Sequence, residues 1–451
     1  MTQGIQNHSI RETDSYWEKF EQSNLEAKHP SWLFPMRKAA MSRFAELGFP
    51  TTQDEDWRFT NVSPISKLPF RPVSEKSRGT LNPAALDQYS FTSLKASRLV
   101  FVDGYFSPEL SNILPQAGGI KIGSLAAALK TDSTLIEKHL ARLAQGGDNA
   151  FTELNTAFFH DGAFIFVPTG QTVAEPVHLL FVSTAPEAGA TTHPRNLIIA
   201  EPGGKLTVIE SYVGATSDAY FTNAVDELVI GENAVVEHCK FQDESPAAFH
   251  LAAIYAHLGR NCNFIAHSIA TGSKLSRNDI RTHLAAEGVE CVLNGLYLTR
   301  EEQLADHHMI VEHAKPHCNS HEYYNGILDG HSKGVFHGRI LVRPDAQKTD
   351  AKQTNKNLLL SDDATIDTKP QLEIYADDVK CTHGATIGQL NDESIFYLRA
   401  RGIGLETARR MLIHAFAGEI IDRIRYAPVR EEMDKIVWDR LEQNHLLAAR
   451  K

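Results

Sequence analysis

The sequence lacks the motifs by which proteins bind nucleotides and the charge by which they hold nucleic acid. There is no GxxxxGK[ST] phosphate loop, and Gly402-Ile403-Gly404 lacks the third glycine of a dinucleotide fingerprint. Across 451 residues, 45 Lys and Arg stand against 56 Asp and Glu, giving a formal charge of -11 and a pI near 6.0. Nucleic acid and anionic lipid are therefore excluded as main partners. Any energy from nucleotide hydrolysis has to come from another protein.

Long apolar runs and paired cysteines are also missing. The N-terminus shows neither a cationic nor an apolar targeting segment, and no apolar run approaches the ~20 residues that a membrane span needs. We therefore expect a cytoplasmic protein. Its cysteines form an odd set without a CxxC pair, which suits a reducing compartment and cannot supply four close thiolates for a zinc or iron–sulfur site. They are Cys239, Cys262, Cys291, Cys318 and Cys381. Any cluster would need ligands from a partner.

A repeat occupies the centre of the chain. From about residue 163 to residue 390, short β-rich runs alternate with Gly, Asn and Asp. Four glycines open similar stretches at spacings of 28, 28 and 29 residues, namely Gly203, Gly231, Gly259 and Gly288. Five residues after each glycine comes an apolar residue that we expect to point inward: Val208, Val236, Phe264 and Leu293. This period favours a parallel β-helix over a β-sandwich, whose strands alternate every ~8–12 residues.

Helical patterns flank this β-rich body. Residues 11–47 and 124–145 have helical spacing, and so do three segments after Gly388. The middle of these, 405–424, carries one apolar stripe made of Ala408, Leu412, Phe416, Ile420 and Ile424. We therefore expect a mainly β protein with a mostly helical region at 1–160, a β-helix at 161–390 and a helical module at 391–451. Since the ends of a solenoid expose unpaired strands, the module is expected to cap one end.

Cys381 and His383 are the first candidates for chemistry. They are two residues apart, so on an extended segment both point to the same side, next to the small Gly384. Thiolate and imidazole suit iron or zinc, but two ligands make only half a site. The alternative, a buried cysteine and a histidine at the end of a strand, stays open.

Histidines form a second concentration, with 12 of the 21 between His238 and His337. The densest set is His307, His308, His313, His317 and His321, with Cys318. Some of its spacings would place ligands on one helix face, but Pro316 and strand-like surroundings argue against a helix. An outer-face or ladder arrangement is favoured over a preformed metal site.

Several motifs resemble the SufB/SufD family of iron–sulfur cluster assembly proteins. They are the segments 337–343, 349–360, 369–374, 381–386 and 397–403, with 48–52 and 55–60 near the N-terminus. The histidine of Thr382-His383-Gly384 has no neighbouring carboxylate, and this makes the chain most similar to the SufD type. The resemblance spans nearly the whole sequence.

The resemblance implies a right-handed parallel β-helix that pairs with a SufB-like paralogue. It also implies C-terminal helices that dock a SufC-like ABC ATPase, with Leu412, Phe416 and Ile420 as contacts. His383 would be a metal ligand at a nascent cluster shared with a cysteine of the paralogue, and Cys381 would be its neighbour. The chain would then be a non-catalytic scaffold with no tightly bound cofactor of its own, able to form a homodimer when isolated.

A solenoid enzyme is the alternative, acting on polysaccharide or as a metal-dependent hydrolase. It would use the acidic residues Asp345, Asp350, Asp362, Asp363 and Asp367. These lie among turn signals and are typical of solvated corners.

Overall fold

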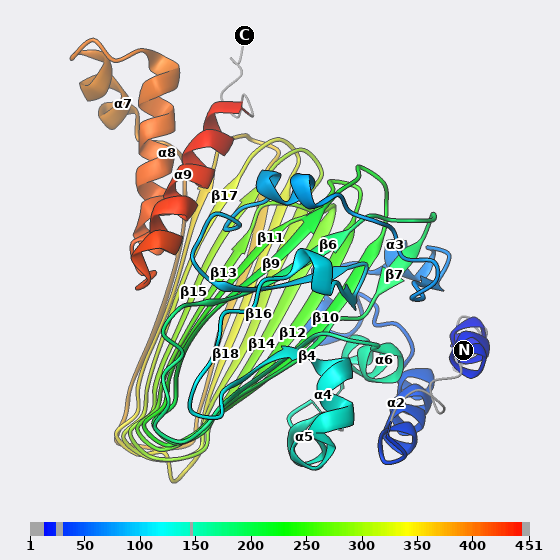
Figure 1. Cartoon of the computed structure of the whole chain (residues 1–451). Helices are drawn as coiled ribbons and strands as arrows, with labels where there is room; N and C mark the ends of the chain where they lie inside the picture. Colours follow the sequence, from blue (N-terminus) through cyan, green and yellow to red (C-terminus); the bar gives the residue numbers. More distant parts are fainter. Residues whose placement is uncertain (1–12, 24–29, 145–147, 444–451) are drawn as a thin grey trace, which may run out of the picture.

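The chain folds into a β-solenoid of about eight turns with helical regions at both ends of the sequence (Figure 1). This computed structural model describes residues 13–23, 30–144 and 148–443. The mainly β fold predicted from the sequence is confirmed. Within the described residues, no helix combines the length and apolar character needed to cross a membrane.

Each coil gives one strand to each of two parallel sheets. Sheet 1 contains β5 (Ala163–Val167), β8 (Arg195–Ala200), β10 (Phe221–Ile230), β12 (Phe249–Leu258), β14 (Leu275–Leu284), β16 (Leu304–His313), β18 (Lys333–Val342) and β20 (Thr365–Ile374). Sheet 2 contains β6 (Val177–Ser183), β9 (Lys205–Gly214), β11 (Val235–Asp243), β13 (Asn263–Ala270), β15 (Glu290–Thr299), β17 (Asn319–Leu328), β19 (Asp350–Leu359) and β21 (Lys380–Gly388). The space between the two sheets is called the lumen below.

The lumen is filled by the inward side chains of alternate strand residues. The four residues expected to point inward are each fully buried and belong to one hydrophobic core. Their predicted alignment is wrong in part, because Val236 pairs with Leu206 and Phe264 pairs with Cys291. The reason is that only Gly231 and Gly259 occupy equivalent turn positions, where a Cβ on Gly259 would lie 3.0 Å from the Gly231 carbonyl carbon.

The N-terminal region closes the first end of the solenoid. Its helices are α2 (Leu33–Leu47), α3 (Ser63–Ser66), α4 (Leu125–Thr131), α5 (Ser133–His139) and α6 (Ala150–Phe158). Its strands β2 (Ser97–Val102), β3 (Tyr105–Phe106) and β4 (Lys121–Ser124) extend the two sheets, while β1 (Arg71–Pro72) pairs with β7 (Ala190–Thr192). The domain boundaries near residues 160 and 390 stay predictions.

The C-terminal helices are α7 (Asp392–Arg399), α8 (Leu405–Ile421) and α9 (Ala427–Gln443). Helices α8 and α9 pack on the outer face of sheet 2, beside β15 and β17 (Figure 1). The expected cap over the end of the solenoid is therefore wrong. Strands β20 and β21 form the last coil, and most residues of β21 are exposed.

A substitution of Gly295 tests how tightly the lumen is packed. A Cβ at this position would lie 2.0 Å from Cε1 of the buried Tyr324 ring, whereas a Cβ on Gly388 meets nothing within 4 Å. We expect Gly295→Ala to lower the free energy of unfolding by about 1–3 kcal/mol through overpacking. Gly388→Ala is the matched control and should change it little. Equal urea-unfolding midpoints for the two variants would contradict this packing.

Candidate functional site

Cys381 and His383 lie at the uncovered end of the lumen. In the parallel register Cys381 pairs with Ala351, and His383 pairs with Gln353. Both partners are buried side chains of the lumen, and residues of one register column share a face. The two candidates therefore face the lumen on β21, with His383 exposed and Cys381 half-buried. The end of the lumen formed by Cys381, His383, Gln353 and the next residue of the column, Glu322, is called the lumen mouth below.

Cys381 is a protonated thiol in this setting. It packs against Ile340, Val342 and Ala351. Burial raises the pKa of the Cys381 thiol, and the nearby Asp350 carboxylate adds to this effect. Because the thiolate is the form that binds metal, Cys381 is not activated as a ligand by its own chain.

Gln353 and Glu322 lie beneath His383, one and two coils into the stack. They are 1% and 0% exposed, and Gln353 Nε2 donates a hydrogen bond to Glu322 Oε2 at 2.6 Å. Gly338 on the facing sheet makes room for this amide, since a Cβ there would lie 2.0 Å from Gln353 Nε2. Sequence reasoning missed both residues. Both residues lie in the same register column as His383. To find them from the sequence, the length of each coil has to be known.

The Glu322 carboxyl is buried, and the described part of the chain gives it no basic partner. Burial raises the pKa of Glu322 to about 7, and the hydrogen bond from Gln353 opposes this only in part. Its other close titratable neighbours are the neutral Cys291 and Tyr324, whose pKa values are also raised by burial. The lumen mouth thus contains a carboxyl group that is poised between its neutral and charged forms.

The dense histidine set does not form one site. His307 points into the lumen, where burial lowers its pKa to about 3, and His308 points to the outer face. His313 Nε2 lies 2.8 Å from Ser320 Oγ, while His321 Nε2 lies 3.7 Å from Asp350. Strand alternation separates these side chains, in agreement with the strand-like surroundings expected from the sequence.

Asp56, His308 and His337 come within metal-ligand distance on the outer face of sheet 1. However, Arg277 Nη2 lies 2.8 Å from His308 Nδ1. Because a guanidinium only donates, Nδ1 accepts, and the neutral ring carries its proton on Nε2. Nε2 lies 3.8 Å from Asp56 Oδ1. His308 therefore offers no lone pair to a metal in this arrangement, which leaves the set with Asp56 and with His337, whose Nε2 has no hydrogen-bond partner among the described residues.

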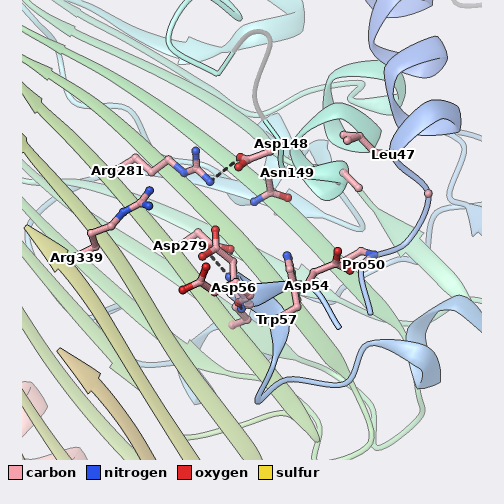
Figure 2. Close-up of a pocket in the computed structure, with 14 residues that line it drawn as sticks. Leu47, Pro50, Asp54, Asp56, Trp57, Asp148, Asn149, Asp279, Arg281 and Arg339 are labelled. Carbon is pink, nitrogen blue, oxygen red and sulfur yellow. Dashed lines mark hydrogen bonds and ion pairs between the residues drawn. The ribbon is translucent and has the colours of Figure 1, made fainter. Parts of the chain in front are cut away.

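Figure 2 shows the pocket beside this cluster, which has a volume of about 400 Å³. Two arginines that line this pocket form ion pairs within the chain. Arg281 Nη2 lies 3.1 Å from Asp148, and Arg277 Nη2 lies 2.9 Å from Asp279. Arg277 also lies 3.7 Å from the centre of the Trp57 ring. The pocket therefore marks where the N-terminal segment is fixed to sheet 1.

Glu237, Cys239 and His267 form a second close set, beneath the turn between α8 and α9. Glu237 Oε1 accepts a hydrogen bond from the backbone N–H of Arg425 at 2.7 Å. Burial raises the pKa of Cys239 well above its usual value. A protonated thiol and a committed carboxylate make this set an anchor for the helices.

Glu210, Asp226 and His238 form a third set, deep in the lumen. Lys240 is buried among them, and its Nζ donates to Asn278 Oδ1 at 3.1 Å. The ammonium group already supplies the positive charge that a metal would bring. This set is therefore a buried network whose charges are compensated within the chain.

The C-terminal module buries Ala408, Ile420 and Ile424 of the expected stripe, but Ile413, Ala417 and Ile421 take the place of Leu412 and Phe416. Its inward residues are Ala408, Ile413, Ala417, Ile420, Ile421 and Ile424. Ile420 is 2% exposed and packs inside the molecule, so it offers no surface to a partner in this arrangement, whereas Leu412 and Phe416 are half-buried at the flank. Phe396, Tyr397 and Met411 are 74%, 57% and 39% exposed on α7 and α8.

The buried carboxyl of Glu322 predicts a distinctive dependence of stability on pH. In the unfolded chain the group ionises near its usual value, below the folded pKa of about 7. Folding therefore loses stability as the pH rises from about 4.5 to 7, and the loss is complete above 7. Glu322→Gln removes this loss and should be more stable than the parent at pH 8, by up to about 3 kcal/mol.

At pH 4.5 the two proteins should differ little, because the parent carboxyl is then neutral in the folded state and only about half ionised in the unfolded chain, which is worth about 0.4 kcal/mol. Urea unfolding with a chelator present at the two pH values measures this difference. Glu290→Gln changes an exposed carboxylate on β15 and is the control. A Glu322→Gln variant that is less stable than the parent at pH 8 would contradict the description of the group.

Comparison with known proteins agrees with this architecture. The family described as "SUF system FeS cluster assembly, SufBD core domain" matches residues 181–416, and the SufBD N-terminal region matches residues 10–179. A SufBD family iron–sulfur cluster assembly protein of Synechocystis is 33% identical over 92% of this chain and 93% of its own length. The iron–sulfur cluster assembly protein SufD of Escherichia coli is 32% identical, over 90% and 93%. The chain therefore belongs to the SufBD family of iron–sulfur cluster assembly proteins and is SufD-like.

Proposed function

We propose that this protein is a non-catalytic scaffold subunit of a cytoplasmic iron–sulfur assembly complex, and that His383 is one ligand of a nascent cluster shared with a partner. The observation that carries the proposal is the position of His383 at the lumen mouth, on the uncovered last strand of the solenoid. A single imidazole beside a protonated thiol holds a cluster poorly. The cluster site is complete only when a second subunit supplies thiolate.

The open end supports a partner that is itself a solenoid. Strands β20 and β21 pair on one side only, with β18 and β19, and leave their other edges unpaired. Exposed edges of this length are templates for strand pairing. A SufB-like paralogue with a matching open end would continue both sheets and bring its cysteine to His383. Two copies of this chain can pair through the same edges when the paralogue is missing.

The C-terminal module supports docking of a SufC-like ABC ATPase. Phe396 and Tyr397 on α7 and Met411 on α8 are exposed apolar side chains, called the patch here, and α7 stands away from the sheets while α8 packs on sheet 2 (Figure 1). Exposed aromatic side chains of this kind favour a protein interface. Leu412 and Phe416 are half-buried residues at the flank of α8, and they remain proposed contacts of the ATPase. The patch, rather than Ile420, is the surface through which we expect the ATPase to bind.

The module is tied to the solenoid by polar contacts as well as apolar ones. Asn325 Nδ2 donates to the carbonyl of Phe416 at 2.9 Å, and Lys356 lies 2.7 Å from Glu419. Arg440 donates to the carbonyl of Thr271 at 2.9 Å. Movement of a docked ATPase would therefore act on sheet 2 and, through it, on the open end.

The solenoid-enzyme alternative gains no support from the acidic residues. Asp350, Asp363 and Asp367 lie next to separate basic side chains, at 3.7 Å from His321, 3.8 Å from His331 and 2.8 Å from Lys333. A glycosidase needs two carboxyl groups facing one another across a substrate. No such pair is formed by these three residues.

His383→Ala tests the ligand role. We expect the reconstituted complex to form cluster at a level reduced by about tenfold or more, because one ligand is missing, while the subunits still assemble. Thr382→Ala is the matched control, since Thr382 is the outward neighbour on the same exposed strand. Cluster formation is followed by its visible absorption, and assembly by gel filtration. Undiminished cluster formation by His383→Ala would remove the ligand role.

The double variant Phe396→Asp, Tyr397→Asp tests the docking patch. We expect it to lose co-purification with the ATPase, because two charges replace the exposed aromatic surface. Ile113→Asp is the control, since Ile113 is an exposed apolar residue of the N-terminal region. The exposed pair is a cleaner test than Phe416, whose replacement would also disturb packing on the sheet. Retained binding by the double variant would exclude the patch as the docking site.

A further inference from the structure

Glu322 differs from four other deeply buried carboxylates of this chain, which are paired with basic side chains. The side chains of these four are at most 1% exposed, and each has a basic side chain within 3 Å. The pairs are Glu227–Arg195, Glu210–His238 and Glu244–His250 at 2.7 Å each, and Asp306–Arg277 at 2.8 Å. Glu322 also differs from Asp226, which accepts from an amide as Glu322 does but has the Lys240 side chain as a nearby positive charge. Among the residues that the structure describes, the Glu322 carboxyl has one hydrogen-bond partner, the amide of Gln353, and no basic neighbour. A buried carboxylate without a counter-charge is costly, so its retention needs a reason.

The atoms around Glu322 offer lone pairs with no donor to match them. The Nε2 group of Gln353 donates a hydrogen bond to Glu322 Oε2. Glu322 Oε1 and Gln353 Oε1 are both buried and have no hydrogen-bond partner. The next residue of the same column is His383, whose imidazole offers a further lone pair when neutral. Three acceptor-bearing side chains therefore follow one another along the column, on neighbouring strands whose backbones are about 4.8 Å apart.

This donor set has the chemistry of a cation site. Carboxylate and amide oxygens with an imidazole nitrogen suit a divalent first-row metal such as Fe²⁺, and the carboxylate supplies the compensating negative charge. Access is through the lumen mouth, because β20 and β21 are not covered. Gly338 leaves the space in which the Gln353 amide lies. The set is thus both reachable from the open end and shaped by the facing sheet.

We propose that Glu322 and Gln353, together with His383, bind divalent iron at the lumen mouth as a substrate, before a cluster forms there. The inference rests on the proposed function, which makes His383 part of the cluster site, and adds an iron-loading step on this chain's own side. Iron enters the lumen mouth from the open end and is held by the two buried oxygens beneath the imidazole. The partner's thiolate then receives iron that is already in place.

The test is anaerobic equilibrium dialysis of the full-length protein against Fe²⁺ alone. We expect the parent to bind one Fe²⁺ per chain, and Glu322→Gln and Gln353→Ala to weaken that binding by about tenfold or more. Glu290→Gln, with its exposed carboxylate on β15, is the matched control and should bind like the parent. Urea unfolding of each variant verifies that it is folded. In crystals soaked with Fe²⁺, anomalous density at the iron edge should lie between Glu322 and His383.

Iron binding that is unchanged in Glu322→Gln and Gln353→Ala would overturn the inference, because ordered water alone would then satisfy the buried oxygens. If that result came with loss of cluster formation in His383→Ala, the iron site would be excluded and the ligand role of His383 would stand. If both luminal variants lost iron while His383→Ala still built clusters, the iron site would stand and the proposed role of His383 would fall.

Discussion

The structure depends on parallel strands that stack in register, coil upon coil. In this arrangement each inward residue lies directly above one residue and below another, so the lumen is a set of columns. Apolar side chains in these columns form one continuous hydrophobic core along the lumen. A polar residue in a column finds its partner in the same lumen or stays without one. The chemistry of Cys381 and His383 is therefore set by the residues beneath them.

The period of the solenoid could be predicted because inward residues are mostly apolar and turns need glycine. The register could not be predicted, because turns differ in length from coil to coil and Gly203 and Gly288 sit at left-handed positions unlike those of Gly231 and Gly259. The shared face of Cys381 and His383 followed from strand alternation alone. Glu322 and Gln353 required the true register, so they emerged only from the structure.

The helical module shows the same limit in another form. A row of residues at four-residue steps, such as Leu412, Phe416 and Ile420, drifts around a helix and follows an inclined ridge. The face that packs on sheet 2 is centred instead on Ile413 and Ala417. The sequence predicted the helices but not which element they cover. Their apolar face packs on the outer face of sheet 2, so these helices do not cover the end of the solenoid.

Strand β17 connects the module to the lumen mouth. Its residues alternate between the two faces, so Tyr323 and Asn325 point outward while Glu322 and Tyr324 point inward. Arg423, which follows α8, lies 3.6 Å from the centre of the Tyr323 ring, and Asn325 donates to the backbone of α8. These contacts are separated from Glu322 by one to three residues of the same backbone. The strand that carries the buried carboxyl is therefore also the strand on which α8 is anchored.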